Sequence, residues 1–385
     1  MGFLLLSLVL SSFLITAASI LNSPPPLPCN YTAIYNFGDS NSDTGGIAAA
    51  FYPPLLPFGE TFFHRPAGRA SDGRLIIDFI AEKLGLPYLS PYLDSIASNF
   101  RRGANFATGG ATIQRPNSSW FVDGLSPFNL EIQVEHFNQL KGRSAYYYNQ
   151  SGKDNDEIVK RLSNPEDLGR ALFILDIGQN DIAAAAATLT RPAAVAGIVD
   201  QFIHQIGILY GLGATTFWIH STGPFGCLPA VISKSKNADD EDEYGCVRSL
   251  NRIAMEFNRE LKSRIGELRT RLPRAAVVYV DMYAAKYGLI SDAAAQGFED
   301  GRVICCGYHG MSYDIWCGKN GALENGTNVY ADSCKNPRRV ISWDGVHYTE
   351  AANRWFADRI ADGSLSDPPV ALATACHMHA TPITN

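Results

Sequence analysis

The stretch "YTAIYNFGDSNSDTGG", residues 31–46, runs from an apolar segment into Gly-Asp-Ser and then into small and polar residues. An apolar run of this length that ends at a glycine predicts a buried strand followed by a tight turn. We expect Ser40 to lie just after the strand, at the start of a helix whose free N–H groups favour negative charge. Taken alone, a serine in this position is more often a helix cap than a nucleophile. The choice depends on whether the chain supplies partners for Ser40.

Three further apolar runs resemble the first one and predict strands. They are "ALFILDI" (171–177), "ATTFWIH" (214–220) and "AAVVYVD" (275–281). Apolar residues at three- and four-residue steps predict amphipathic helices over 198–209 and 250–272. This alternation is typical of an α/β fold in which helices cover a central parallel sheet.

Ligands of such sheets bind beyond the carboxyl ends of the strands. The loops that begin at Gly38, Gly178 and Ser221 should therefore meet at one site. The chain shows no internal repeat and no linker, so we expect one domain over residues 30–370, followed by a tail at 371–385.

The composition excludes several classes of protein. Hydrophobic residues make up 46% of the 385 residues and charged residues 18%, as in an ordinary globular protein. The formal net charge is -6, so the chain has no overall field that would attract nucleic acid or an anionic membrane surface. We therefore predict neither nucleic acid nor a membrane as a partner.

The first 19 residues, "MGFLLLSLVLSSFLITAAS", form an apolar stretch that ends in small residues. This pattern predicts a cleaved secretory signal peptide; an N-terminal anchor is the alternative. Four Asn-x-Ser/Thr sequons agree with secretion and are candidate glycosylation sites. They begin at Asn30, Asn117, Asn149 and Asn325.

Eight cysteines in a secreted chain predict disulfides. Cys227 and Cys246 would close a loop, and "CCGYHGMSYDIWCG" (305–318) with Cys334 supplies four more sulfurs. With His309 that segment superficially resembles a zinc site, but its spacing lacks the paired C-x-x-C units of structural zinc. We therefore expect no metal, and we expect the segment "ACHMHA" (375–380) to be a loosely ordered end.

A serine hydroxyl needs a histidine to take its proton and a carboxylate to orient that histidine. The segment "WDGVH" supplies Asp344 and His347, three residues apart, on what reads as a turn before a helix. This spacing allows the carboxylate to reach one imidazole nitrogen while the other faces outward. His220 is the rival base, but no acid stands at a comparable offset, so a structural or pocket-wall role is expected for it.

A tetrahedral intermediate also needs donors for its oxyanion. The segment "NFATGGAT" (105–112) offers the backbone N–H groups of Gly109 and Gly110, and "DIGQND" (176–181) offers the side chain of Asn180. Singly, such residues are usually turns and caps. Together with Ser40 and the Asp-x-x-His pair they fill every role in serine acyl transfer.

These residues match a known family. The chain resembles the plant secreted GDSL esterase/lipases of the SGNH hydrolase superfamily, whose four blocks stand here as "FGDSNSDTGG", "NFATGGAT", "GQND" and "WDGVHYTEAAN". The similarity extends from about residue 31 to about residue 369. It implies a flavodoxin-like three-layer α/β/α sandwich. Asn41 replaces the leucine of the family name, and Ala70 and Ser221 depart from common residues in ways that bear on substrate preference.

The resemblance also assigns roles. Ser40 is implied as nucleophile and first oxyanion donor, Gly109 (chosen over Gly110) as second donor, Asn180 as third, and Asp344 with His347 as the rest of the triad.

The branch it is most similar to includes early-nodulin-like proteins, acetylesterases of plant glycosides and alkaloids, and polysaccharide deacetylases. We therefore expect an esterase, without cofactor, that removes acetyl or another small acyl group from a cell-wall polysaccharide or glycosylated metabolite in the apoplast or wall. The alternatives are a lipase or acyltransferase with the same triad, an α-fucosidase-like glycosidase using Asp39 and Asp344, and a non-catalytic carbohydrate-binding glycoprotein.

Overall fold

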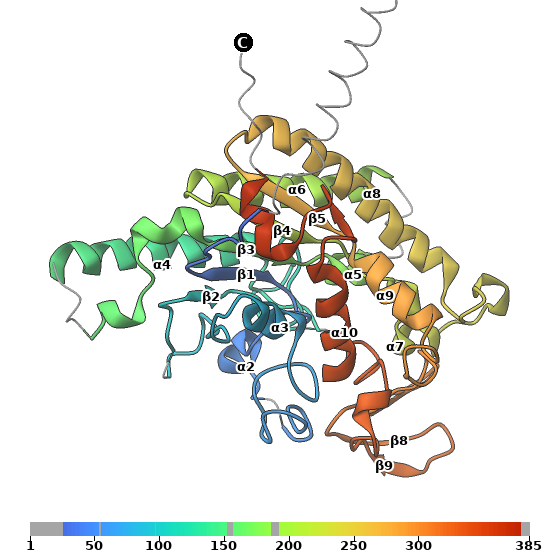
Figure 1. Ribbon diagram of the computed structural model, residues 1–385. Coiled ribbons are helices and arrows are strands. Elements are labelled where there is room, and N and C mark those ends of the chain that lie inside the picture. The colour runs from blue at the N-terminus through green and yellow to red at the C-terminus, as the bar shows by residue number, and fades with distance from the viewer. Residues whose placement is uncertain are drawn as a thin grey trace, which may run out of the picture.

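A six-stranded sheet forms the centre of the molecule in the computed structural model, which describes residues 26–53, 55–96, 98–122, 124–151, 157–185 and 192–378 (Figure 1). The expected signal peptide lies outside these residues. The strands are β1 (Ile34–Gly38), β2 (Gly103–Asn105), β3 (Leu172–Asp176), β4 (Thr216–His220), β5 (Ala276–Val280) and β10 (Ser366–Asp367). The first five are parallel, and β10 pairs antiparallel with β5.

The strand order, β10-β5-β4-β3-β1-β2, places β1 inside the sheet, between β3 and β2. The chain therefore builds outward from β1 in both directions, and this reversal opens a crevice at the carboxyl ends of β1 and β3. The predicted flavodoxin-like arrangement is confirmed. The four predicted strands are also correct; β2 and β10, of three and two residues, are too short to produce a recognisable pattern.

Helices cover both faces of the sheet (Figure 1). One layer contains α4 (Leu130–Ser151), α6 (Pro192–Gly211) and α8 (Arg248–Arg271); the other contains α3 (Ile76–Lys83), α9 (Met282–Ser291) and α10 (Glu350–Ala361). Shorter helices are α2 (Gly46–Ala50), α5 (Gln179–Ala185) and α7 (Pro229–Ile232). Short 3₁₀ helices span Val159–Arg161, Pro165–Arg170, Phe225–Cys227, Ala238–Asp240, Pro337–Arg339 and Leu372–His377.

The two predicted amphipathic helices correspond to α6 and α8, and the second prediction extends one residue, Leu272, beyond the end of α8. The buried side of α8 presents Phe257, Leu261, Ile265 and Leu268, which follow the helical period toward the sheet. No helix in the described part of the chain is long and apolar enough to cross a membrane.

A disulfide-stapled segment, residues 305–334, projects between α9 and α10. It contains two small hairpins, β6 (Gly307–His309) with β7 (Asp314–Trp316) and β8 (Asn320–Ala322) with β9 (Asn328–Tyr330). Its four sulfurs form the disulfides Cys305–Cys334 and Cys306–Cys317, and Cys227 pairs with Cys246. The prediction of disulfides in place of a zinc site is confirmed.

The expectation that the segment 375–380 is loosely ordered is wrong for its described part, residues 375–378. Cys376 forms a disulfide with Cys29, so the C-terminal end of the described chain is fixed to the N-terminal segment before β1. Leu372 and Ala375 are buried in the main core. The pairing partner stands 347 residues away, so no local pattern in the sequence could reveal it.

Removing this long-range disulfide should destabilise the fold. Loss of the cross-link frees the unfolded chain to expand, and the double substitution Cys29→Ser, Cys376→Ser should lower the free energy of unfolding by about 2–4 kcal/mol. The shift of the urea midpoint measures this. The double substitution Cys227→Ser, Cys246→Ser opens a loop of only 19 residues and should cost less. An unchanged midpoint for the Cys29, Cys376 variant would show that the disulfide contributes nothing to stability.

Candidate active site

Ser40 lies in the turn that follows β1, half-buried at the carboxyl edge of the sheet. The expectation that Ser40 starts a helix is wrong, because α2 begins only at Gly46. Asp43 does the capping: its carboxylate accepts the N–H groups of Gly45 at 2.7 Å and Ile47 at 3.0 Å. The Ser40 hydroxyl is therefore not the group that satisfies the helix N-terminus.

The turn that carries Ser40 is held by buried polar side chains. Gln133 on α4 donates to the carbonyl of Gly38 at 2.8 Å and accepts the Gly38 N–H at 2.9 Å. Gly38 itself must lack a Cβ, which would lie 2.5 Å from the carbonyl oxygen of Asp176 on β3. Helix α4 and strand β3 thus fix the main chain just before Ser40, as a preorganised site requires.

Asp344 and His347 form a direct pair in the loop before α10. One oxygen of Asp344 accepts from His347 Nδ1 at 2.7 Å, and the other accepts the N–H groups of Val346 at 3.0 Å and His347 at 2.8 Å. The carboxylate is buried, whereas the His347 side chain is 17% exposed. The spacing in the sequence predicted this contact, which leaves Nε2 of His347 as the nitrogen free to exchange a proton.

Ser40 is not hydrogen-bonded to the other two predicted triad residues, Asp344 and His347, within the described part of the chain. Asp39, directly before Ser40, lies close enough to His347 for its charge to help raise the pKa of the imidazole. The catalytic roles of the three residues therefore stay predictions.

The pH dependence of activity should reflect the pKa of His347, which the neighbouring Asp344 carboxylate raises. Burial alone lowers the pKa of His347, but the Asp344 carboxylate outweighs it and holds the pKa above the usual 6.5. Only the unprotonated ring can accept a proton from serine, so kcat/KM should rise with pH through a midpoint above 6.5. The rate of p-nitrophenyl acetate hydrolysis, followed from below pH 6.5 into the alkaline range, measures this. A flat profile would contradict the assignment of His347 as base.

The preference for Gly109 as an oxyanion donor conflicts with the structure. The Gly109 N–H donates to Asp43 at 2.7 Å and is not available to a substrate. The Gly110 N–H makes no hydrogen bond within the described residues, and its carbonyl, which accepts from Ser126 at 2.9 Å, fixes the turn. A φ of +79° explains why glycine stands at position 110.

Asn180, in the first turn of α5, contacts the same turn. Its amide donates one hydrogen to the carbonyl of Ala111 at 2.9 Å, and the second amide hydrogen has no partner in the described residues. The adjacent Asp181 accepts the N–H groups of Ile113 at 2.8 Å and Gln114 at 3.1 Å. The second and third sequence blocks are thus joined to each other at the sheet edge.

His220 has an acid partner that the sequence did not reveal. Its Nδ1 lies 3.2 Å from an oxygen of Asp176, which ends the neighbouring strand β3. The ring is 1% exposed and so cannot reach a substrate in solvent. This burial agrees with a structural role for His220, and the acid beside it comes from another strand rather than from a nearby position in the sequence.

A buried cluster of charges underlies the site, and sequence reasoning missed it. Burial and the adjacent Asp176 raise the pKa of Asp39 to about 7. Lys286 on α9 is buried beside them, with its Nζ 4.7 Å from the ring centroid of Tyr348. A single lysine in a helical pattern normally indicates an exposed face, so nothing in the sequence pointed to this position.

One group of potential metal ligands occurs in the described residues, namely Cys29, Cys376 and His377. The two sulfurs are bonded to each other and so cannot act as thiolate ligands.

Comparison with known proteins relates the chain to plant esterases. A family model described as GDSL-like lipase/acylhydrolase matches residues 34–360. A GDSL esterase/lipase of Arabidopsis thaliana is 48% identical over 377 residues, which cover 96% of each chain. An esterase of Hevea brasiliensis is 47% identical over 358 residues, covering 91% of this chain and 90% of the relative. Alpha-L-fucosidase 3 of Arabidopsis thaliana is 45% identical over 362 residues, covering 90% of this chain and 95% of the relative.

Proposed function

The chain belongs to the GDSL-like lipase/acylhydrolase family and is an esterase, and we propose that it is secreted and removes small acyl groups from carbohydrate esters. Ser40 is the nucleophile, His347 the general base and Asp344 the residue that orients His347. The observation that carries the assignment is the 2.7 Å contact between His347 Nδ1 and the buried Asp344 carboxylate. It fixes the tautomer in which Nε2 accepts a proton.

The reaction proceeds in two halves. Ser40 Oγ attacks the ester carbonyl while Nε2 of His347 takes the hydroxyl proton, and the imidazolium then gives that proton to the departing alcohol. Water enters, loses a proton to the same nitrogen, and attacks the acyl group on Ser40. Release of the acid regenerates the serine. Asp344 stabilises the imidazolium in both halves without itself becoming protonated.

Three donors serve the oxyanion. We assign them to the N–H of Ser40, the N–H of Gly110 and the second amide hydrogen of Asn180. All three hydrogens are free of other partners in the described residues, whereas the N–H of Gly109 donates to Asp43. Gly110 therefore replaces Gly109 in the proposed site.

Substitution of Asn180 should slow the chemical step. Asn180→Ala removes one oxyanion donor and should lower kcat about 10²- to 10³-fold with little change in KM. Steady-state kinetics on p-nitrophenyl acetate provide the measurement, with Ala184→Ser, exposed on the same helix, as the control. Full kcat in Asn180→Ala would remove Asn180 from the oxyanion hole.

Exposed aromatic side chains on and beside the segment that follows the Ser40 turn support a carbohydrate substrate. Tyr52 and Trp120 are strongly exposed, and Trp120 packs edge-on against Phe51 with ring centroids 4.9 Å apart. Phe51 follows α2, the helix whose first turn is capped by Asp43 in the Ser40 turn. Exposed aromatic faces suit the apolar faces of sugar rings. The sequence offers no amphipathic segment as a lid for a long acyl chain, which favours a small acyl group.

The name of the third relative raises a glycosidase as a second candidate. Hydrolysis of a glycosidic bond needs two carboxylates that flank it. Asp39 and Asp344 are the only pair proposed from the sequence, and both are buried. Asp344 is also fully engaged by His347 and two backbone N–H groups. The esterase proposal therefore ranks first.

The substrate proposal is tested by identifying released products. The purified protein and Ser40→Ala are incubated separately with acetylated polysaccharides, acyl glycosides, triglycerides and fucosides. We expect acetate or another small acid from the carbohydrate esters, released only by the unsubstituted protein. Long-chain acids would favour a lipase, acyl transfer to an added sugar an acyltransferase, and fucose release that survives the substitution a glycosidase.

Secretion is proposed from the apolar leader and the sequons. The side chains of Asn30, Asn117, Asn149 and Asn325 are all exposed, as glycosylation requires. Sequencing the N-terminus of the protein recovered from plant culture medium tests the proposal. A chain that begins near residue 20 and loses mass on glycosidase treatment supports it; a chain retained in cells with its leader intact contradicts it.

A further inference from the structure

A second histidine–aspartate pair lies behind the loop that carries Asp344. The ring of His309, on β6, has its Nε2 2.8 Å from the main-chain carbonyl oxygen of Asp344 and its Nδ1 2.7 Å from Asp314 on β7. The His309 side chain is completely buried. This ring therefore contacts main chain of the proposed catalytic acid and is not itself open to a substrate.

The ring of His309 also shapes the loop by packing. A Cβ at Gly345, the residue after Asp344, would lie 2.8 Å from Cδ2 of His309, and Gly345 has a φ of +91°. Trp316 also packs against the imidazole of His309, with the two ring centroids 4.9 Å apart. The path of the chain between Asp344 and His347 is thus fitted closely to the imidazole of His309.

Both ring nitrogens of His309 lie within hydrogen-bond distance of an acceptor group. A backbone carbonyl and an ionised carboxylate can only accept. Although partial burial opposes ionisation, hydrogen bonds from Lys234 and His309 hold the pKa of Asp314 below its usual range. Lys234 Nζ lies 2.5 Å from the second oxygen of Asp314. His309 is therefore held at one nitrogen by an anchored carboxylate and holds the Asp344 carbonyl with the other.

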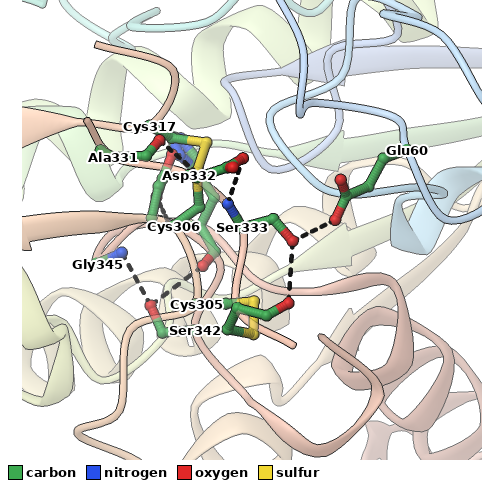
Figure 2. The surroundings of a disulfide bond; sticks show 12 residues. Glu60, Cys305, Cys306, Cys317, Ala331, Asp332, Ser333, Ser342 and Gly345 are labelled. Atoms are coloured by element: carbon green, nitrogen blue, oxygen red, sulfur yellow. Dashed lines mark hydrogen bonds and ion pairs between the residues drawn. A yellow bond between two sulfur atoms is a disulfide. The ribbon is translucent and has the colours of Figure 1, made fainter. Parts of the chain in front are cut away.

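The disulfide-stapled segment brings His309 to this position. Figure 2 shows Cys305 and Cys306 beside Ser342, with Gly345 directed at the Ser342 hydroxyl. The N–H of Cys305 donates to the carbonyl of Ser342 at 3.1 Å, and the N–H of Cys306 donates to that of Trp343 at 2.6 Å. The segment is thus hydrogen-bonded along the chain that leads into Asp344.

We infer that His309 is a positioning residue for catalysis: it holds the main chain of Asp344 so that the carboxylate stays aligned with His347. The inference rests on the proposed function, because that function gives Asp344 and His347 their roles. His309 touches neither substrate nor reacting atoms and acts only through the loop. Misplacement of a catalytic group by about 1 Å can slow a reaction about 10²-fold, so a smaller shift of Asp344 suffices for a tenfold loss.

Two amide variants separate positioning from stability. In His309→Gln the side-chain amide takes the place of Nε2 and still donates to the Asp344 carbonyl. In His309→Asn the shorter amide takes the place of Nδ1 and reaches only Asp314. Both variants lose the ring, so a purely structural role would affect them alike. Tyr308→Ala, on the same strand but exposed, is the control.

We expect His309→Asn to lower kcat on p-nitrophenyl acetate about tenfold or more at nearly unchanged KM, and His309→Gln to stay within about threefold of the unsubstituted protein. Tyr308→Ala should retain full kcat. Thermal midpoints are measured in parallel, and assays are run well below them. Equal kcat in the two amide variants, whether full or reduced, would overturn the inference.

Ser40→Ala in the same assay separates the two proposals. If Ser40→Ala is inactive while His309→Asn keeps full kcat, the triad stands and only the positioning role fails. If Ser40→Ala keeps full activity, both the proposed function and the role of His309 are overturned.

Discussion

Ser40→Ala should abolish hydrolysis, with kcat on p-nitrophenyl acetate reduced about 10⁶-fold or to the limit of detection. Alanine leaves no oxygen at which an acyl-enzyme can form, so the remaining rate comes only from binding and the oxyanion donors. The Asp344–His347 pair does not depend on the Ser40 side chain and should stay intact. Binding of a slowly hydrolysed carbohydrate ester should therefore change little.

The control for this substitution is Ser364→Ala, an exposed serine in the loop after α10. It should keep the kcat and KM of the unsubstituted protein. Residual activity above about 1% in Ser40→Ala, after exclusion of contaminating esterase, would point to a different nucleophile.

Asp344→Asn should lower kcat about 10⁴-fold. The asparagine amide can donate to Nδ1 of His347, which shifts the ring hydrogen to Nε2 and leaves that nitrogen unable to accept the serine proton. The substitution also removes the charge that raises the pKa of His347, so the midpoint of any residual activity should move to lower pH. Both effects are read from kcat/KM measured against pH.

Asp332→Asn is a matched control for this change, because Asp332 is an exposed carboxylate in the disulfide-stapled segment. It should leave both the rate and the pH midpoint unchanged. An Asp344→Asn enzyme that keeps more than about a tenth of the activity, with the same midpoint, would mean that another acid orients the base.

Much of the fold could be predicted because it is local in sequence. The strands β1, β3, β4 and β5 are apolar runs that end at polar or glycine residues, and each is fully buried. The contact between Asp344 and His347 was predictable for the same reason, since the two residues stand three positions apart in one loop.

The remaining features depend on contacts between distant segments. Asp176 reaches His220 from the next strand, and Cys376 reaches Cys29 across almost the whole chain. The choice between Gly109 and Gly110 also turned on a distant residue, because Asp43 takes the N–H of Gly109. Residue types alone do not show which of two neighbouring N–H groups stays free.

The central claim is that Ser40 is the nucleophile of an esterase, and covalent labelling tests it most directly. The purified protein is treated with an organophosphate ester until activity is lost, digested, and mapped by mass spectrometry. The account predicts one modified residue, Ser40, with labelling slowed strongly in Asp344→Asn. Loss of activity with the label on another residue, and Ser40 unmodified, would contradict it.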